Sequence, residues 1–398
     1  MNIRDPGGLN EGYRRAPAVS AHRIRTAVSH AALPERAAQE IAAQLGGHDS
    51  GFVFAFLPAG VPPDALSAAL GTALPGLTIF GCTTAGQITE NGYEDDALLV
   101  VSFPRRHFRV ASHLFAPLGP VAIGSVAREA ARLAVRFPER PDRRRLAIIL
   151  ADGLSKLEDM FVAAVHAGLG PIPVFGGSAG DAQNFDSTHV LHGGEVHGHA
   201  GLLVLIETDL DFRSLGFHHF MPTEHRMVVT DAIPEERLVL ELNGVPAAAE
   251  YSRLVGHEID QLSPLVFAEN PVLVRSGNAF HVRAIQEIHE SGGLTFLSAI
   301  DTGLPLTLGR GKAILETLKA GLSVTDDAGR SPDFILGFDC FLRKLEIVQK
   351  GFLAEASEVL GRSRVRGFNT YGEQHLGVHV NQTFVGVAFF EPSGSISS

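Results

Sequence analysis

One pattern recurs three times along this chain and constrains its fold more than any other feature. Each copy has an apolar run, a helical stretch, a second apolar run that breaks into a Gly/Ser/Thr-rich turn, and a closing apolar run. The copies begin at Phe52–Leu57, Leu146–Leu150 and Phe334–Phe338. Strands that are apolar throughout are covered on both faces, and the intervening helices supply that cover. The pattern therefore predicts an α/β (α+β) fold of repeated strand–helix–strand units with mixed sheets.

Between the second and third copies the chain changes character. Residues 227–243 alternate apolar and polar side chains, and the short apolar runs that follow are joined by Ser-Gly-Asn and Ser-Gly-Gly turns. Such spacing is typical of an antiparallel sheet. We therefore expect two domains, 31–235 and 236–391, preceded by a flexible leader at 1–30 and followed by a tail at 392–398.

Composition excludes several classes of function. The formal net charge of -11 argues against a nucleic-acid partner, because phosphate binding needs a concentrated basic face. Two cysteines are too few for a disulfide framework, and the N-terminus lacks the apolar segment of a secretory signal. No run approaches the roughly 20 apolar residues of a membrane span. We therefore expect a cytoplasmic protein without a membrane span.

The glycine-rich turns are the first candidate ligand site. They follow apolar strands, and open α/β sheets bind ligands at the carboxyl ends of their strands. The turns match neither a Walker loop nor a dinucleotide fingerprint, so a purely structural role is an equal alternative. The candidate ligand-binding residues here are Cys82, Thr83, Thr84, Gly177 and Ser178.

The densest polar cluster lies near the C-terminus, beside apolar strands. Mixed donors and acceptors can fix a small ligand in a largely apolar pocket, or they can buttress the joint between the two domains. Both interpretations stay open. Arg275 adds a guanidinium that a ligand carboxylate could use, although a structural ion pair is the commoner fate. The clustered candidates are Thr370, Tyr371, Glu373, Gln374, Asn381 and Gln382.

Several segments resemble a known family. Residues 228–251, 282–303 and 337–346 are similar to the FIST domains of bacterial signal transduction. The motif Gly-Phe-Asn-Thr-Tyr-Gly-Glu-Gln at 367–374, followed by His-Val-Asn-Gln at 379–382, looks like the nitric-oxide-sensing branch of that family. The resemblance implies a sensory protein, not an enzyme, that binds a small ligand or binds nitric oxide through haem. Its implied partner is a histidine kinase or a cyclic-di-GMP enzyme.

The haem implied by the resemblance would need a neutral imidazole that faces an apolar pocket. His379 lies in the last motif, and His219 lies among apolar and aromatic residues. Either histidine is a candidate for the iron ligand.

A hydrolase- or transferase-like enzyme on the same α/β layers is the alternative function. Ser178, Asp181, His379 and Cys82 supply the residue types that such chemistry needs. This alternative requires a nucleophile and a base within hydrogen-bond reach of each other.

Overall fold

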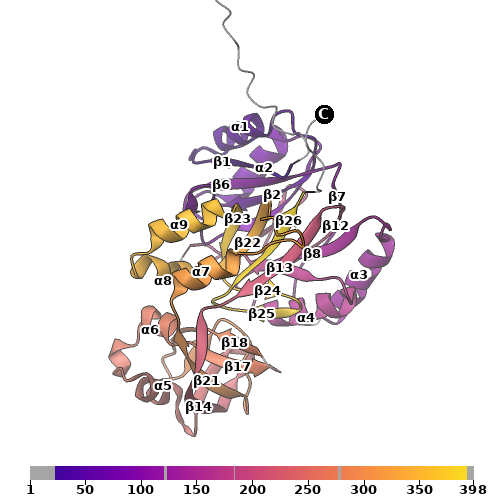
Figure 1. Ribbon diagram of the computed structural model, residues 1–398. Helices are drawn as coiled ribbons and strands as arrows, with labels where there is room; N and C mark the ends of the chain where they lie inside the picture. Colours follow the sequence, from indigo (N-terminus) through magenta and orange to yellow (C-terminus); the bar gives the residue numbers. More distant parts are fainter. Residues whose placement is uncertain (1–22, 121–122, 183, 277–278, 392–398) are drawn as a thin grey trace, which may run out of the picture.

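The structure is a computed structural model that describes residues 23–120, 123–182, 184–276 and 279–391 (Figure 1). Its body consists of three equivalent units, as the recurring pattern predicts. Each unit runs edge strand, helix, strand, one or two helices, parallel strand, short hairpin and closing strand. A separate antiparallel sheet, which we call the insert (residues 220–311), interrupts the third unit.

The first unit is formed by residues 25–104. Its elements are β1 (Arg25–Ser29), α1 (Pro34–Leu45), β2 (Ser50–Leu57), α2 (Pro63–Ala73), β3 (Thr78–Thr83), β4 (Gln87–Thr89), β5 (Gly92–Glu94) and β6 (Leu98–Pro104). The flexible leader predicted at 1–30 is too long. All five residues of β1, Arg25–Ser29, pair with β6, so this segment is a strand. The predicted leader's residues 1–22 and the predicted tail lie outside the described residues.

The second unit repeats this order. Its elements are β7 (Phe108–Phe115), α3 (Ile123–Arg136), β8 (Arg144–Ala151), α4 (Glu158–Leu169), β9 (Val174–Ser178), β10 (Val190–His192), β11 (Glu195–His197) and β12 (Gly201–Thr208).

The third unit begins before the insert and ends after it. Its elements are β13 (Asp211–Phe217), α7 (Ile314–Leu322), β22 (Phe334–Cys340), α8 (Phe341–Gln349), α9 (Leu353–Arg362), β23 (Val365–Thr370), β24 (Glu373–His375), β25 (Val378–Val380) and β26 (Phe384–Phe390). The helical stretch of this third copy consists of two helices, α8 and α9, because Gly351 adopts a left-handed φ of 74° between them.

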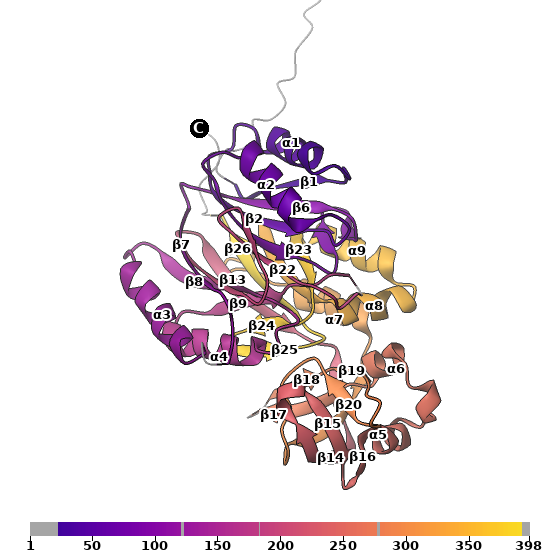
Figure 2. The ribbon, with the colours of Figure 1, turned by 180° about the vertical axis from the view of Figure 1, so that it is seen from behind.

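The insert carries the antiparallel sheet that the alternating segment predicts. Its elements are β14 (Phe220–Ile233), η1 (Pro234–Glu236), β15 (Leu238–Leu242), β16 (Val245–Pro246), α5 (Ala247–Val255), η2 (Ile259–Gln261), α6 (Pro264–Glu269), β17 (Val272–Ser276), β18 (Ala279–Arg283), β19 (Ile285–Ile288), β20 (Leu294–Phe296) and β21 (Pro305–Gly311). The boundary expected at 235/236 falls in η1, inside the insert. Figures 1 and 2 show the insert as a lobe below the body.

The three units exchange their hairpins in a ring. Strand β10 of the second unit pairs with β3 of the first, β24 of the third pairs with β9 of the second, and β4 of the first pairs with β23 of the third. Each six-stranded sheet therefore holds four strands of one unit and the hairpin of another. Phenylalanines from all three units, including Phe56, Phe175 and Phe338, share one buried core between the sheets.

The same glycine position recurs in all three units. Gly81, Gly176 and Gly367 each lie on the second parallel strand, directly opposite a residue of the first. A Cβ added at these positions would lie 1.9, 1.9 and 1.7 Å from the facing backbone carbonyl oxygen. The glycines of the predicted turns are thus required by strand packing. In the described ranges no helix is long and apolar enough to cross a membrane.

Replacing Gly367 by alanine should destabilise the fold by roughly 1–3 kcal/mol or more, because the facing Gly337 carbonyl belongs to a central strand and cannot move aside. Urea unfolding measures the change. Gly71→Ala on α2 is the matched control, since nothing lies within 4 Å of its added Cβ and alanine favours helix. Equal unfolding midpoints for the two variants would contradict the close-approach argument.

Candidate functional site

A cavity of about 700 Å³ lies between the second unit and the insert. Its volume falls within the roughly 300–1,000 Å³ range of small-molecule sites. One wall is the loop before α3 together with the start of α4, and the other wall belongs to the insert. The lining residues are Leu118, Pro120, Ser155, Lys156, Leu157, Asp159, Met160, Pro234, Glu235, Arg237, Ala299 and Asp301.

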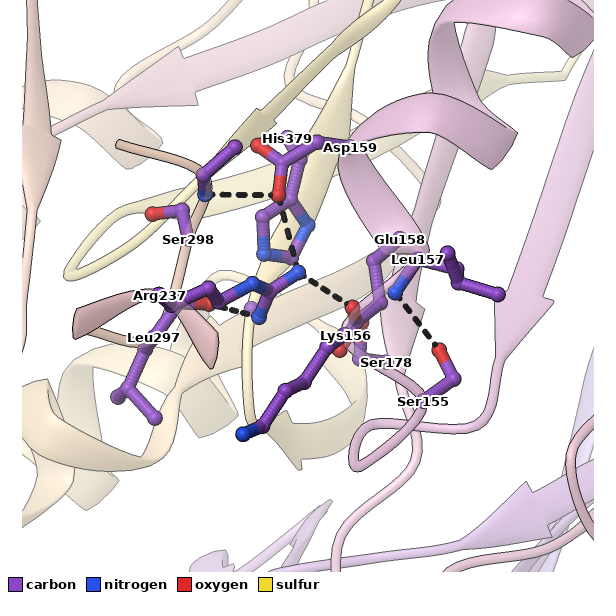
Figure 3. Close-up of polar contacts among 12 residues, drawn as sticks. Ser155, Lys156, Leu157, Glu158, Asp159, Ser178, Arg237, Leu297, Ser298 and His379 are labelled. Atoms are coloured by element: carbon purple, nitrogen blue, oxygen red, sulfur yellow. Dashed lines mark hydrogen bonds and ion pairs between the residues drawn. The ribbon is translucent and has the colours of Figure 1, made fainter. Parts of the chain in front are cut away.

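Arg237 links the two walls (Figure 3). Arg237 is buried, with 5% of the residue exposed. Its guanidinium donates hydrogen bonds to Glu158 at 2.6 Å and to Asp159 at 3.0 Å. A third hydrogen bond, of 2.7 Å, runs to the carbonyl oxygen of Leu297 within the insert. Arg237 holds a left-handed φ of 54°, which is strained for a residue with a side chain. The ion pairs at the start of α4 help to hold this backbone in place.

Two carboxylates therefore share one guanidinium. Burial raises the pKa of Glu158 to about 7, against the opposing attraction of Arg237. Burial also disfavours the ionised form of Asp159, but His379, Arg237 and Arg283 around it hold its pKa below the ordinary value. The backbone N–H of Ala299 donates to Asp159 at 3.0 Å as well. Asp159 thus carries the charge, and Glu158 is the carboxyl that takes up a proton near neutral pH.

His379 lies behind this ion pair, on β25 (Figure 3). It is 2% exposed, and burial lowers its pKa to about 4, so its imidazole is neutral at pH 7. Its Nδ1 lies 3.4 Å from Nε2 of Gln374, which also donates to the Ser178 hydroxyl at 2.8 Å. Within the described residues its Nε2 has no hydrogen-bond partner. That nitrogen faces Gly372, where an added Cβ would come within 2.6 Å of it.

Part of the predicted C-terminal polar cluster forms hydrogen bonds between the body and the insert. Asn381 accepts a hydrogen bond from Ser298 of the insert, and Gln382 donates to the carbonyl of Ala268 at 2.8 Å. Both contacts cross from the body to the insert. This part of the cluster buttresses the joint.

Glu373 and Tyr371 complete that network inside the body. Glu373 accepts from Thr370 and, at 2.6 Å, from Thr383, while burial raises its pKa to about 8. The Tyr371 hydroxyl donates to Asp181. Neither residue lines the cavity.

The other predicted ligand residues do not line the cavity. The Thr84 hydroxyl donates to the Leu57 carbonyl at 2.8 Å, and Thr83 accepts from the backbone of His189. Cys82 is buried, and that burial raises its pKa well above the ordinary value. Gly177 packs against Thr370 in the same interior. The two glycine-rich turns are also hydrogen-bonded to each other, since the backbone N–H of Gly180 donates to the carbonyl oxygen of Thr83 at 3.0 Å.

Arg275 lies exposed on β17 of the insert and is likewise absent from the cavity lining.

His219 does not fit a haem ligand. It is fully buried, its Nε2 lies 2.8 Å from Glu346, and its Nδ1 lies 3.1 Å from Arg343. Burial lowers its pKa to about 4, and the neutral ring then donates to the carboxylate and accepts from the guanidinium. His379 is neutral, but its Nε2 is buried, and Gly372 packs so close to the ring that even an added Cβ would lie 2.6 Å from that nitrogen. In this arrangement neither candidate histidine fits a haem.

The residues proposed for enzyme chemistry do not assemble into a nucleophile–base pair. The hydroxyl of Ser178 is hydrogen-bonded to the amide of Gln374 rather than to a base. Asp181 accepts from the backbone N–H groups of residues 185–187, which holds that loop. Among the described residues, no group of three or more His, Cys, Asp or Glu could hold a metal ion.

Sequence reasoning missed Glu158, Asp159 and Arg237. Two acids at a helix start are ordinary partners of the helix dipole, and an arginine after Pro-Glu-Glu reads as exposed turn. Only contact between two segments 78 residues apart gives these side chains a shared role.

The layered body and the insert form two lobes with a cavity at their joint. The FIST N domain model matches residues 49–245, and the FIST C domain model matches residues 247–375. The chain belongs to the FIST family, whose domains are sensory modules of signal transduction that bind small ligands. A relative, an uncharacterized protein of Methanocaldococcus jannaschii, is 22% identical over 352 residues, covering 78% of this chain and 67% of the relative.

Glu158→Gln should remove part of the pH dependence of stability. Because the folded pKa of Glu158 is raised from 4.5 to about 7, the folded protein holds this proton more tightly than the unfolded chain. The wild type should therefore lose stability relative to the variant as pH rises from about 4.5 to about 7, with no further loss above that window. Urea unfolding at several pH values measures the difference. Glu35→Gln, an exposed change on α1, should follow the wild type; parallel curves for Glu158→Gln and wild type would refute the assignment.

Proposed function

We propose that this protein senses a small ligand bound in the joint cavity and relays the signal to a separate partner. The carrying observation is that the two walls of the cavity belong to different lobes, which Arg237 joins. A ligand that fits one arrangement of the lobes better than another shifts the protein toward that arrangement. The resemblance in the last motif supports a histidine kinase or a cyclic-di-GMP enzyme as the partner, which co-purification tests.

The lining supports a ligand with an apolar body and a polar group. Leu118, Leu157 and Met160 give apolar surface, while Lys156 and Asp159 offer opposite charges beside it. An apolar lining with a few placed polar groups is usual for small-molecule sites, because the apolar part gives affinity and the polar part gives orientation. This division of roles supports selectivity among small metabolites.

Met160→Trp should weaken ligand binding, because the larger indole would narrow the cavity beside Asp159. Ligands come from a thermal-shift screen of small acids, amines and zwitterions, since any compound that binds only the folded state raises the melting temperature. The matched control is Val348→Trp on α8, because Val348 and Met160 are both 45% exposed. Compounds that stabilise the wild type and Val348→Trp should raise the melting temperature of Met160→Trp less. Equal shifts in all three proteins would place binding elsewhere.

Haem is a separate prediction of the resemblance, and the packing around both candidate histidines argues against it. We expect ferrous haem titrated into the purified protein to keep the absorbance spectrum of free haem. A stoichiometric Soret band that responds to nitric oxide and is lost in His379→Ala would overturn this expectation. It would also show that the hairpin of β24 and β25 moves away from Gly372.

A further inference from the structure

The outer face of α3 is a basic stripe on an acidic protein. Arg128, Arg132 and Arg136 are spaced by four residues, so they lie on one side of the helix, and all three are exposed. Val135 lies on the same side and is 79% exposed, the highest value among the large apolar side chains of the described residues. The opposite side buries Val126 and Ala130 against the second unit. Figures 1 and 2 both place α3 at the periphery of the body.

The positive charge of this stripe is largely unneutralised. Arg132 forms an ion pair with Glu129 of the same helix. Within the described ranges, the ion pairs leave Arg128 and Arg136 without a carboxylate partner. The chain as a whole carries a formal net charge of -11, so the charge of this face is opposite in sign to the net charge of the protein. Arginine and an apolar side chain side by side are typical of protein–protein contacts.

The stripe is mechanically connected to the cavity. Leu118 and Pro120 line the cavity and precede α3, while Asp159 and Met160 line it from the first turn of α4. The two helices touch at the backbone, since a Cβ added at Gly168 of α4 would lie 2.2 Å from the carbonyl oxygen of Ala127 in α3. Packing this close has no slack to absorb a displacement. A shift at the start of α4 therefore reaches α3.

We propose that the outer face of α3, formed by Arg128, Arg132, Val135 and Arg136, docks an acidic protein surface that presents an apolar side chain. This surface belongs to the partner that reads the sensor, so the proposal rests on the proposed function. A nucleic acid or an anionic membrane is disfavoured, because the remaining negative charge of the protein would repel an extended polyanion. A protein surface no larger than one helix would contact only the stripe and would avoid the negative charge on the rest of the protein.

Fluorescence anisotropy with a defined probe tests the proposal. The probe is a fluorescein-labelled helical peptide in which glutamates flank a stripe of leucine and valine, added to the full chain without ligand. The test variant carries Arg128→Glu, Arg132→Glu and Arg136→Glu. The control carries Arg36→Glu, Arg105→Glu and Arg362→Glu, which change three exposed arginines elsewhere by the same charge. Circular dichroism checks that both variants fold.

The α3 variant should bind the peptide at least about tenfold more weakly, and the control should stay within about twofold of wild type. Val135→Ser should weaken binding by about threefold, since it removes apolar contact without changing charge. Arg128, Arg132 and Arg136 do not line the cavity, so the α3 variant should still be stabilised by the compounds found in the thermal-shift screen. Failure of the cavity and failure of the stripe are therefore distinguishable. Equal loss in both triple variants, or no peptide binding by the wild type, would overturn the proposal. So would preferential binding of phosphatidylserine vesicles or duplex DNA, or self-association that the α3 variant abolishes.

Discussion

The exchange of hairpins between the three units is the constraint on which the rest of the structure depends. A two-stranded hairpin is marginally stable alone, but here each one extends the sheet of a neighbouring unit. The ring of exchanges makes the three units one cooperative body. It also carries His379 from the C-terminal unit to the sheet of the second unit, beside α4. There His379 helps to hold the pKa of Asp159, which lines the candidate cavity, below the ordinary value.

The joint with the insert combines buried charge with a small apolar cluster, in which Ala284 and Leu297 of the insert pack with Phe341 and Tyr371 of the body. Arg237 faces Glu158 and Asp159, while Asn381 and Gln382 bind across the same joint from the other side. Losing one partner of a buried ion pair typically costs about 3–5 kcal/mol, whereas a modest rearrangement that keeps all partners costs little. Relative motion of two lobes is the usual expectation across a joint that is not large and apolar. That property suits a sensor better than a rigid scaffold.

The recurring units were predictable because apolar strands, helix lengths and glycine-rich breaks are local signals. The edge strand β1 was not, since its pairing with β6 is a tertiary contact. The break between α8 and α9 follows from Gly351, a local signal that was overlooked. The cluster of Gln374, His379 and Asn381 was identified as polar and adjacent to strands. Its partners were not, because Arg237 and Asp159 are remote in sequence and each looks ordinary where it stands. Cys82 and Arg275, which were also predicted to bind a ligand, do not line this cavity.

The exchange of hairpins also has a consequence while the chain is being synthesised. When the first 245 residues have emerged, β9 still exposes the edge that β24 will cover, and the hairpin of β4 and β5 has no sheet to join. Open edges of this kind pair with other chains. The nascent N-terminal part therefore depends on the last strands for protection. A gene fragment that ends at the boundary between the two FIST domains would yield a polypeptide inclined to aggregate, although it contains two complete sets of unit strands.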